Sequence, residues 1–228
     1  GHLDTLKTLV EHGADVNQPN HQQITPLMMA ASHNHYQIVK TLLDHGADVN
    51  KMDGKAWTAV VYALNNYHLE IVKTLLEYGA DIKKTGKKGS EALIKASSDG
   101  QFEIVKTLIE YGVDIHQMDE KECTALIKAS NNGHLDIVKT LVEYGADINQ
   151  SNHQGTTSLM MAAARNHYEI VKTLLDHGAD VNKAKDKMWT PLMKASNNRN
   201  LEMVKTLLEY GADINRTNNE GTSPLFVA

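Results

Sequence analysis

The chain has 228 residues, of which 41% are hydrophobic and 5% aromatic, and its formal net charge is −5. This acidic balance argues against nucleic acid as a partner, because phosphate binding needs a strongly basic surface. One cysteine, Cys123, excludes an internal disulfide and is typical of a reducing compartment, and no apolar run approaches the roughly 18 residues of a membrane span. We therefore expect a cytoplasmic protein without membrane insertion, or a secreted effector that acts inside a host cell.

A single motif recurs along the chain at a fixed interval. It reads HLEIVKTLLEYGADI at His68–Ile82, and its Gly-Ala-Asp marker returns every 33 residues from Gly13 to Gly211, with Val113 replacing Ala once. A fixed period of this size marks a stack of supersecondary units, each in contact with its neighbours. The expected units are 1–19 (partial), 20–52, 53–85, 86–118, 119–151, 152–184, 185–217 and 218–228 (partial). Neither end carries a polar capping unit, which predicts a piece of a longer array.

Each unit predicts two short helices and a loop. Thr25-Pro26 is a helix-start signal, because the hydroxyl caps free N–H groups and the missing N–H of Pro costs nothing there. Asn34 ends this first helix, and a second is expected at about 36–45 before Gly46 ends it as a left-handed cap. The polar, turn-rich stretch that follows predicts an extended finger. The capping hydroxyl recurs at Thr58, Thr124, Thr157, Thr190 and Ser223.

The stretch TPLMMAA…NHYQIVKTLLDHGADVN resembles the ankyrin repeat, and the resemblance covers the whole chain. It implies an all-α solenoid of helix-turn-helix pairs with β-hairpin-like fingers. The first helices carry Ala where the second carry Leu and Ile, so we expect the array to curve with first helices and fingers on its concave face. The weakest match is Lys83–Glu91, where Gly86 replaces the usual finger-tip Asp or Asn and Glu91 the capping Thr. A basic finger is expected there, either steering an acidic partner or simply solvated; its lysines are Lys83, Lys84, Lys87 and Lys88.

The resemblance implies that partners bind at the fingers and at the exposed side of the first helices. Trp57 and Trp189 are the sharpest candidates, because an exposed Trp on a polar finger is unusual and Trp is enriched at binding hot spots. Alternatively, each ring packs across the base of its finger, against Met52 or Ala184. The other candidates are Tyr62, Lys55, His21, His33, Asn65, Asn66, Lys95, Lys128, Asn131, Asn132, Arg165, Lys194, Asn197 and Asn198.

One position of the first helix is basic in three units, as Lys95, Lys128 and Lys194. If it lines the concave face, the groove is basic and apolar and suits an acidic amphipathic peptide. Alternatively, these lysines are solvated and lie over apolar surface. The same position holds Met29, Tyr62 and Met161 in other units.

The sequence carries few signals of covalent modification, metal binding or catalysis. The resemblance implies possible oxygenase hydroxylation at asparagines that follow Asp-Val or Asp-Ile. The twelve histidines recur at the spacing of the repeat, which is not that of a ligand set, so no metal or other cofactor is implied. No P-loop, GxGxxG, HExxH or GxSxG motif is present, and we expect no enzyme. The matching asparagines are Asn17, Asn50, Asn149, Asn182 and Asn215.

The sequence therefore favours a protein–protein interaction scaffold that binds another protein or peptide. Two alternatives stay open: a regulatory or tethering segment of a larger enzyme, channel or effector, and a stiff structural spacer. A longer period overlies the short one, since His21–Lys51 matches His153–Lys183 at 25 of 31 positions. A block of four units was duplicated, so similar surface features are expected twice.

Overall fold

The computed structural model describes residues 2–184 and 189–228, with the backbone but not the side chain of Lys84. Within these residues there are thirteen α-helices, one 3-10 helix and no β-strand, and a single isolated antiparallel bridge joins Ser151 to Thr157. The expected all-α helical repeat fold is confirmed. The helices are α1 (Leu3–Glu11), α2 (Pro26–Ser32), α3 (Tyr36–Asp44), α4 (Ala59–Asn65), α5 (Leu69–Glu77), η1 (Lys83–Thr85), α6 (Lys87–Ser98), α7 (Phe102–Glu110), α8 (Ala125–Asn132), α9 (Leu135–Glu143), α10 (Ser158–Ala164), α11 (Tyr168–Asp176), α12 (Pro191–Asn197) and α13 (Leu201–Glu209).

The helix ends follow the local signals of the sequence. The Thr25 hydroxyl accepts a hydrogen bond from the Met28 N–H at 3.3 Å, which caps α2 as predicted. Asn34 adopts a left-handed φ of 58° between α2 and α3, and Gly46 adopts +82° after α3. The Gly46 N–H then bonds the Leu43 carbonyl at 3.0 Å, so the last turn of the helix keeps its partners.

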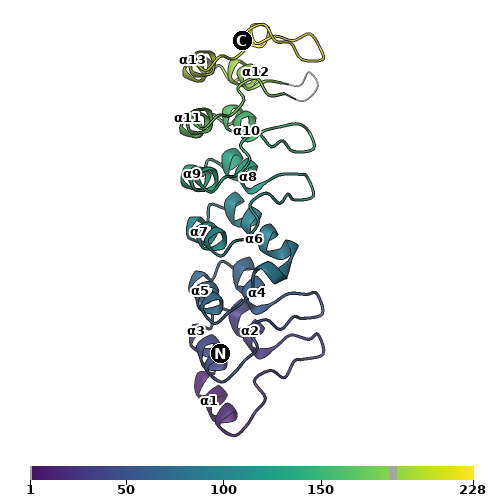
Figure 1. The fold of residues 1–228 in the computed structure, drawn as a ribbon, viewed down its shortest axis with the longest axis vertical. Coiled ribbons are helices and arrows are strands. Elements are labelled where there is room, and N and C mark those ends of the chain that lie inside the picture. The colour runs from purple at the N-terminus through teal and green to yellow at the C-terminus, as the bar shows by residue number, and fades with distance from the viewer. Residues whose placement is uncertain (1, 185–188) are drawn as a thin grey trace. The chain divides into compact units, whose positions relative to one another are not determined.

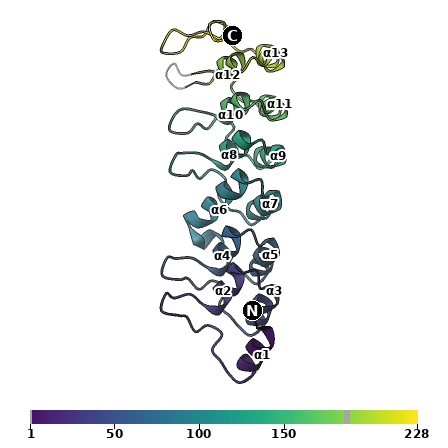
Figure 2. The same ribbon diagram turned by 180° about the vertical axis from the view of Figure 1, so that it is seen from behind.

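The chain divides into two compact parts, each built from several of the 33-residue repeats. We call these parts unit 1 and unit 2 and describe them separately. Unit 1 comprises Gly1–Leu93 and Thr107–Asp114. Within it, α2 packs against α3 and α4, and α3 packs against α1 and α5. Figures 1 and 2 show α2 and α4 between the second helices, α3 and α5, and the finger loops that precede each first helix. The fully buried side chains of this unit include Leu27, Leu42, Leu64, Ile71 and Leu75.

Unit 2 comprises Ile94–Lys106 and Ile115–Ala228. Its first helices α8, α10 and α12 pack in succession, and α9 packs against α11. The contact between α8 and α10 is more extensive than that between α9 and α11, because small side chains such as Ala129 and Ala162 let first helices approach closely. The curvature expected from this difference stays a prediction.

The expected finger at Lys83–Glu91 is wrong. Here η1 and the long helix α6 replace the extended loop. The Thr85 hydroxyl bonds the Ile82 carbonyl at 2.5 Å and accepts the Gly89 N–H at 3.1 Å, and so closes the start of α6. Gly86 has no side chain around which a finger could fold, which is the physical reason for the change. Lys87 and Lys88 therefore lie in a helical turn, and Lys88 pairs with Glu91 at 2.8 Å.

Candidate partner-binding surface

Among the described residues, five fingers fold around the side chain of one Asn or Asp, which we call the hub residue. In unit 1, the Asp53 Oδ1 accepts the backbone N–H groups of Lys55 and Trp57, both at 2.8 Å. Such side-chain-to-backbone bonds are typical of Asx turns. The fingers are thus ordered turns that hold their side chains at fixed positions. The other hub residues with the same pair of bonds are Asn20, Asp119, Asn152 and Asn218.

The Trp57 finger of unit 1 carries an aromatic pair. The Trp57 and Tyr62 rings meet edge to face, with centroids 5.3 Å apart and planes at 66°. The Tyr62 hydroxyl donates to the Asp53 Oδ2 at 2.7 Å. Trp57 is half-buried, and Met52, the alternative neighbour expected from the sequence, is 42% exposed. The ring partner of Trp57 is therefore Tyr62.

This pair perturbs both titrating groups. Burial alone would raise the pKa of Asp53, but hydrogen bonds from the Trp57 N–H, the Tyr62 hydroxyl and the Lys55 N–H lower it below its ordinary value. Burial and the bond to Asp53 raise the pKa of Tyr62 to about 12. At neutral pH, Asp53 is thus a carboxylate and Tyr62 a neutral donor to it.

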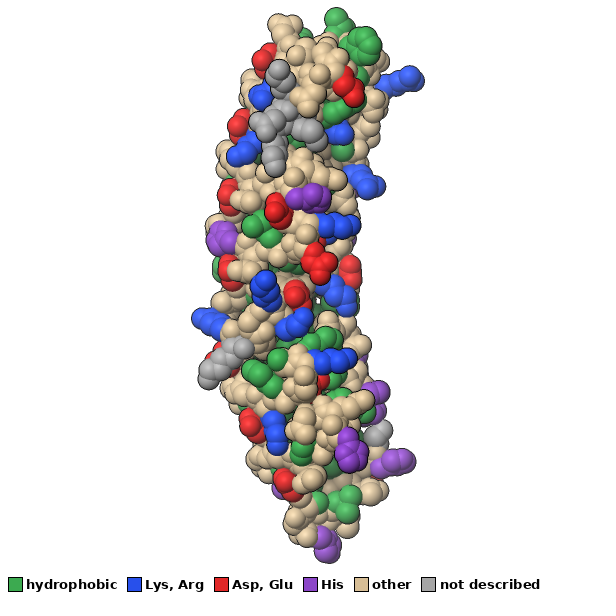
Figure 3. All heavy atoms as spheres, turned by 90° about the vertical axis from the view of Figure 1, so that its right-hand side faces the viewer, with side chains coloured by type: hydrophobic (Ala, Val, Ile, Leu, Met, Phe, Trp, Pro, Cys, Tyr) green, Lys and Arg blue, Asp and Glu red, His purple; other side chains and the backbone are tan. Residues whose placement is uncertain are grey.

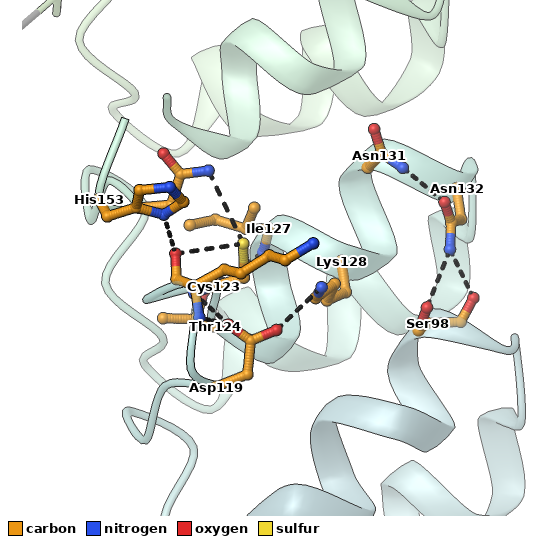
Figure 4. Close-up of polar contacts among 11 residues, drawn as sticks. Ser98, Asp119, Cys123, Thr124, Ile127, Lys128, Asn131, Asn132 and His153 are labelled. Atoms are coloured by element: carbon orange, nitrogen blue, oxygen red, sulfur yellow. Dashed lines mark hydrogen bonds and ion pairs between the residues drawn. The ribbon is translucent and has the colours of Figure 1, made fainter. Parts of the chain in front are cut away.

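In unit 2 the equivalent hub pairs with a lysine. The Asp119 Oδ2 lies 2.9 Å from the Lys128 Nζ, and the two side chains are 26% and 28% exposed (Figure 4). The hydrogen bond to Asp119 raises the pKa of Lys128, against the effect of burial. The sequence left open whether Lys128 faces a partner or is solvated and lies over apolar surface. Its ammonium is paired with Asp119 within the chain, and its contact with a partner stays a prediction.

The second tryptophan, Trp189, lies in unit 2 and is also half-buried. The Lys194 Nζ lies 4.7 Å from the centroid of its ring, a cation–π contact. Lys194 occupies the same position in its repeat as Tyr62 does in the repeat of Trp57. In both copies, therefore, the residue five positions after the Trp covers part of its ring.

A shallow, open groove in unit 2 gathers several expected residues. It has a volume of about 620 Å³ and lies where first helices end and second helices begin. The Asn132 Nδ2 donates to the Ser98 carbonyl at 2.7 Å, and the Asn131 Nδ2 donates to the Asn132 Oδ1 at 2.6 Å (Figure 4). Arg165 is exposed and has no side-chain partner among the described residues. We call this the helix-end groove; its lining residues are Ser98, Asp99, Asn131, Asn132, His134, Arg165 and His167.

The remaining candidates do not gather into one site. His33 bonds the Met29 carbonyl at 2.9 Å and stacks on His35, with ring centroids 6.0 Å apart. The amides of Asn66 and Asn198 donate to the Tyr62 and Ala164 carbonyls, at 2.9 and 2.8 Å. Figure 3 shows acidic and basic side chains interspersed over the finger side. The other candidates are exposed or half-buried there or on the first helices: His21, Lys55, Asn65, Lys95 and Asn197.

The asparagines expected as hydroxylation sites link successive helix pairs. The Asn182 Nδ2 donates to the Gly211 carbonyl at 3.0 Å, and its Oδ1 accepts the Asp213 N–H at 2.8 Å. Asn17, Asn50 and Asn149 make the same two bonds. These amides are structural links, and their hydroxylation stays a prediction.

The sequence reasoning missed two features of this surface. Histidines at the start of second helices bond a carbonyl at the end of the first helix of the preceding repeat; His68 Nε2, for example, lies 3.2 Å from the Ser32 oxygen, and His134 and His167 repeat the contact. The carbonyl accepts, so Nε2 carries the proton. The second feature is the coupling between the hub and the residue nine positions later. Its signal is covariation: an Asp hub occurs with Tyr62 or Lys128, and an Asn hub with Met29 or Met161.

In the part of the chain that the structure describes, no three His, Cys, Asp or Glu side chains gather so that they could hold a metal ion. No helix in the described ranges combines the length and apolar character needed to cross a membrane.

Two family profiles match the chain. One, described as "Ankyrin repeats (3 copies)", matches residues 1–53, 50–119 and 93–185, and the other, "Ankyrin repeats (many copies)", matches residues 183–228. No curated protein matches the chain. Ankyrin repeats generally serve as protein–protein interaction modules and are typically not enzymes. With matches along its whole length and a fold of paired helices and fingers, the chain belongs to the ankyrin repeat family.

Proposed function

We propose that this chain binds a partner protein or peptide through its fingers and the exposed sides of its first helices. The observation that carries the proposal is the helix-end groove of unit 2. It brings together Asn131, Asn132 and Arg165, which the sequence selects independently of any structure. Amide groups and a guanidinium are suited to bind the backbone and the carboxylates of a peptide.

The groove is also preorganised. Asn131 and Asn132 are held by hydrogen bonds to each other and to Ser98, so these side chains lose little rotamer freedom when a partner binds. Each side chain that must be ordered on binding costs roughly 0.5–1.5 kcal/mol, and a surface fixed in advance avoids part of this cost. Mechanistically, the chain presents a rigid surface and uses no cofactor.

The test compares two charge reversals in the same unit. Arg165→Glu inverts the charge in the groove, whereas Arg199→Glu makes the same change at an exposed position outside the groove lining. Both variants should keep the circular dichroism spectrum and the melting curve of the original chain. Proteins captured from source-cell lysate by the original chain and by Arg199→Glu, but lost with Arg165→Glu, would support the proposal. Equal capture by all three baits would place the partner elsewhere.

A stiff spacer is the second candidate function. The asparagine links bridge successive helix pairs through two backbone hydrogen bonds each, which suits a rod as well as a binding scaffold. A spacer predicts that no partner is captured by any bait and that charge reversals are tolerated in the cell. The regulatory or tethering segment of a larger protein makes the same prediction for this segment, but flanking sequence would then encode the active domain.

A further inference from the structure

The Trp57 finger has the composition of a site for a positively charged group. The half-buried Trp57 ring and the Tyr62 ring meet at 66°, which makes a corner of two aromatic surfaces. The Asp53 carboxylate accepts a hydrogen bond from the Tyr62 hydroxyl at 2.7 Å, and Asp53 is 9% exposed. Aromatic faces attract ammonium and guanidinium groups, and a shielded carboxylate nearby adds to this attraction.

The second tryptophan of the chain shows that this finger position accepts a cation. Trp189 lies 132 residues after Trp57, at the equivalent position of the duplicated block. There the Lys194 ammonium lies 4.7 Å from the ring centroid. In unit 1 the residue at the Lys194 position is Tyr62, and among the described residues no cation lies over Trp57.

The surrounding charges also differ between the two tryptophans. In the sequence, the Asp53 hub position corresponds to Lys185, which lies outside the described residues, and Tyr62 corresponds to Lys194. The Trp57 finger therefore combines the Asp53 carboxylate with two aromatic rings. At the two positions that correspond to Asp53 and Tyr62, the sequence around Trp189 has lysines. The Trp57 finger itself carries two lysines. The Lys51 ammonium donates to the Asn17 carbonyl at 3.1 Å, and the exposed Lys55 side chain is open to screening by water.

We infer that the Trp57 finger binds a cationic side chain, Arg or Lys, of the partner, whereas Trp189 is closed to such a group because Lys194 already covers its ring. The inference rests on the proposed partner binding, and it specifies that the partner group bound at the Trp57 finger is positively charged. The basic position of the first helix, which is Lys95, Lys128 or Lys194 in three repeats, led us to expect an acidic peptide. At the Trp57 finger this position holds Tyr62, so for this finger we infer a cationic ligand in place of the acidic one.

The two tryptophans of the chain allow both sites to be observed in one spectrum. Each indole N–H gives one signal in a ¹⁵N-correlated NMR spectrum, and Trp57→Phe and Trp189→Phe assign them. The probe is N-acetyl-arginine methylamide, with N-acetyl-glutamate methylamide as the matched control at equal ionic strength. We expect the Trp57 signal to shift saturably with the arginine probe, and the Trp189 signal to stay unchanged with both.

Two variants test the roles of the supporting residues. Asp53→Asn removes the charge but keeps a hub residue that other fingers of this chain use, as at Asn20 and Asn152. It should raise the apparent Kd of the arginine probe about two- to fivefold. Lys194→Met places at Trp189 the residue found at Met29 and Met161, and should make the Trp189 signal respond to arginine.

Several results would overturn the inference. These are no shift at Trp57 with arginine, equal shifts at both tryptophans, or a stronger response to the glutamate probe. An unchanged Kd of the arginine probe in Asp53→Asn would show that the Asp53 carboxylate does not contribute to binding, which contradicts the proposed site. The outcome is separable from that of the proposed function, since loss of capture in Arg165→Glu together with no arginine response would leave partner binding intact and reject only the cationic ligand.

Discussion

The asparagine links make a quantitative prediction about what holds successive helix pairs together. Asn182→Ala removes two hydrogen bonds across helix pairs, one to the Gly211 carbonyl at 3.0 Å and one from the Asp213 N–H at 2.8 Å. A typical hydrogen bond contributes about 0.5–1.5 kcal/mol net, and these groups regain water because they are exposed. We expect a loss of about 1–2 kcal/mol in the free energy of unfolding.

The chain contains a matched control for this substitution. Asn215 occupies the same unit position and its N–H bonds the Asp213 carboxylate at 2.9 Å, as that of Asn182 bonds Asp180. Within the described residues, the Asn215 side chain makes no link to a later helix pair. Asn215→Ala should therefore cost at most about 0.5 kcal/mol, the usual range for a surface change.

The assay is urea unfolding followed by far-UV circular dichroism, combined with hydrogen exchange at the Asp213 amide. Hydrogen exchange is needed because long repeat arrays depart from two-state behaviour. Asn182→Ala should lower the unfolding midpoint and the protection of the Asp213 amide, whereas Asn215→Ala should leave that protection unchanged. An equal loss of stability in both variants would refute the reasoning, since the asparagine would then act within its own turn.

Three further predictions concern single groups. Thr124→Ala should cost about 1 kcal/mol in urea unfolding and Thr58→Ala clearly less, because Thr124 accepts the Ile127 N–H while the Thr58 hydroxyl has no partner; equal costs would contradict this. Ser130→Ala should raise stability by up to about 1 kcal/mol, since its fully buried hydroxyl has no partner, and a loss would show an unseen bond. The folded-state pKa of Tyr62, about 12, lies above the ordinary value, so its stabilising bond to Asp53 is complete below pH 10 and is lost as pH rises through 12. Tyr62→Phe should therefore be less stable than the original chain by about 1 kcal/mol below pH 10, and this gap should narrow at higher pH; a gap independent of pH would contradict the assignment.

Much of the fold could be predicted because its signals are local. A capping hydroxyl such as that of Thr25 and a left-handed Gly such as Gly46 define helix ends within a few residues. The region around Gly86 could not be predicted in the same way. A polar, turn-rich stretch fits an extended loop and a helix start equally well, and the choice depends on whether Thr85 or a hub residue supplies the hydrogen bonds.

The contacts among the candidate residues were harder to predict from the sequence. The sequence selected Tyr62 and Lys128 one at a time as candidate partner-binding residues, and it did not show that each also bonds the hub of its own finger. The histidine contacts were missed for a related reason. His134 meets the Ser98 carbonyl 36 residues earlier, and a repeat spacing alone does not show which backbone group lies within reach.

The hub explains how such a surface changes while its scaffold does not. One side-chain oxygen suffices to fold the finger, as Asn20 and Asn152 show. In Asp53 and Asp119 the second oxygen is left over, and it binds the residue nine positions later. An exchange between Asn and Asp thus preserves the turn. It decides whether the finger can bind the residue nine positions later, which is a hydroxyl at Tyr62 and an ammonium at Lys128. Binding properties can therefore diverge through a few positions of the repeat, while the buried stripe and the asparagine links stay the same.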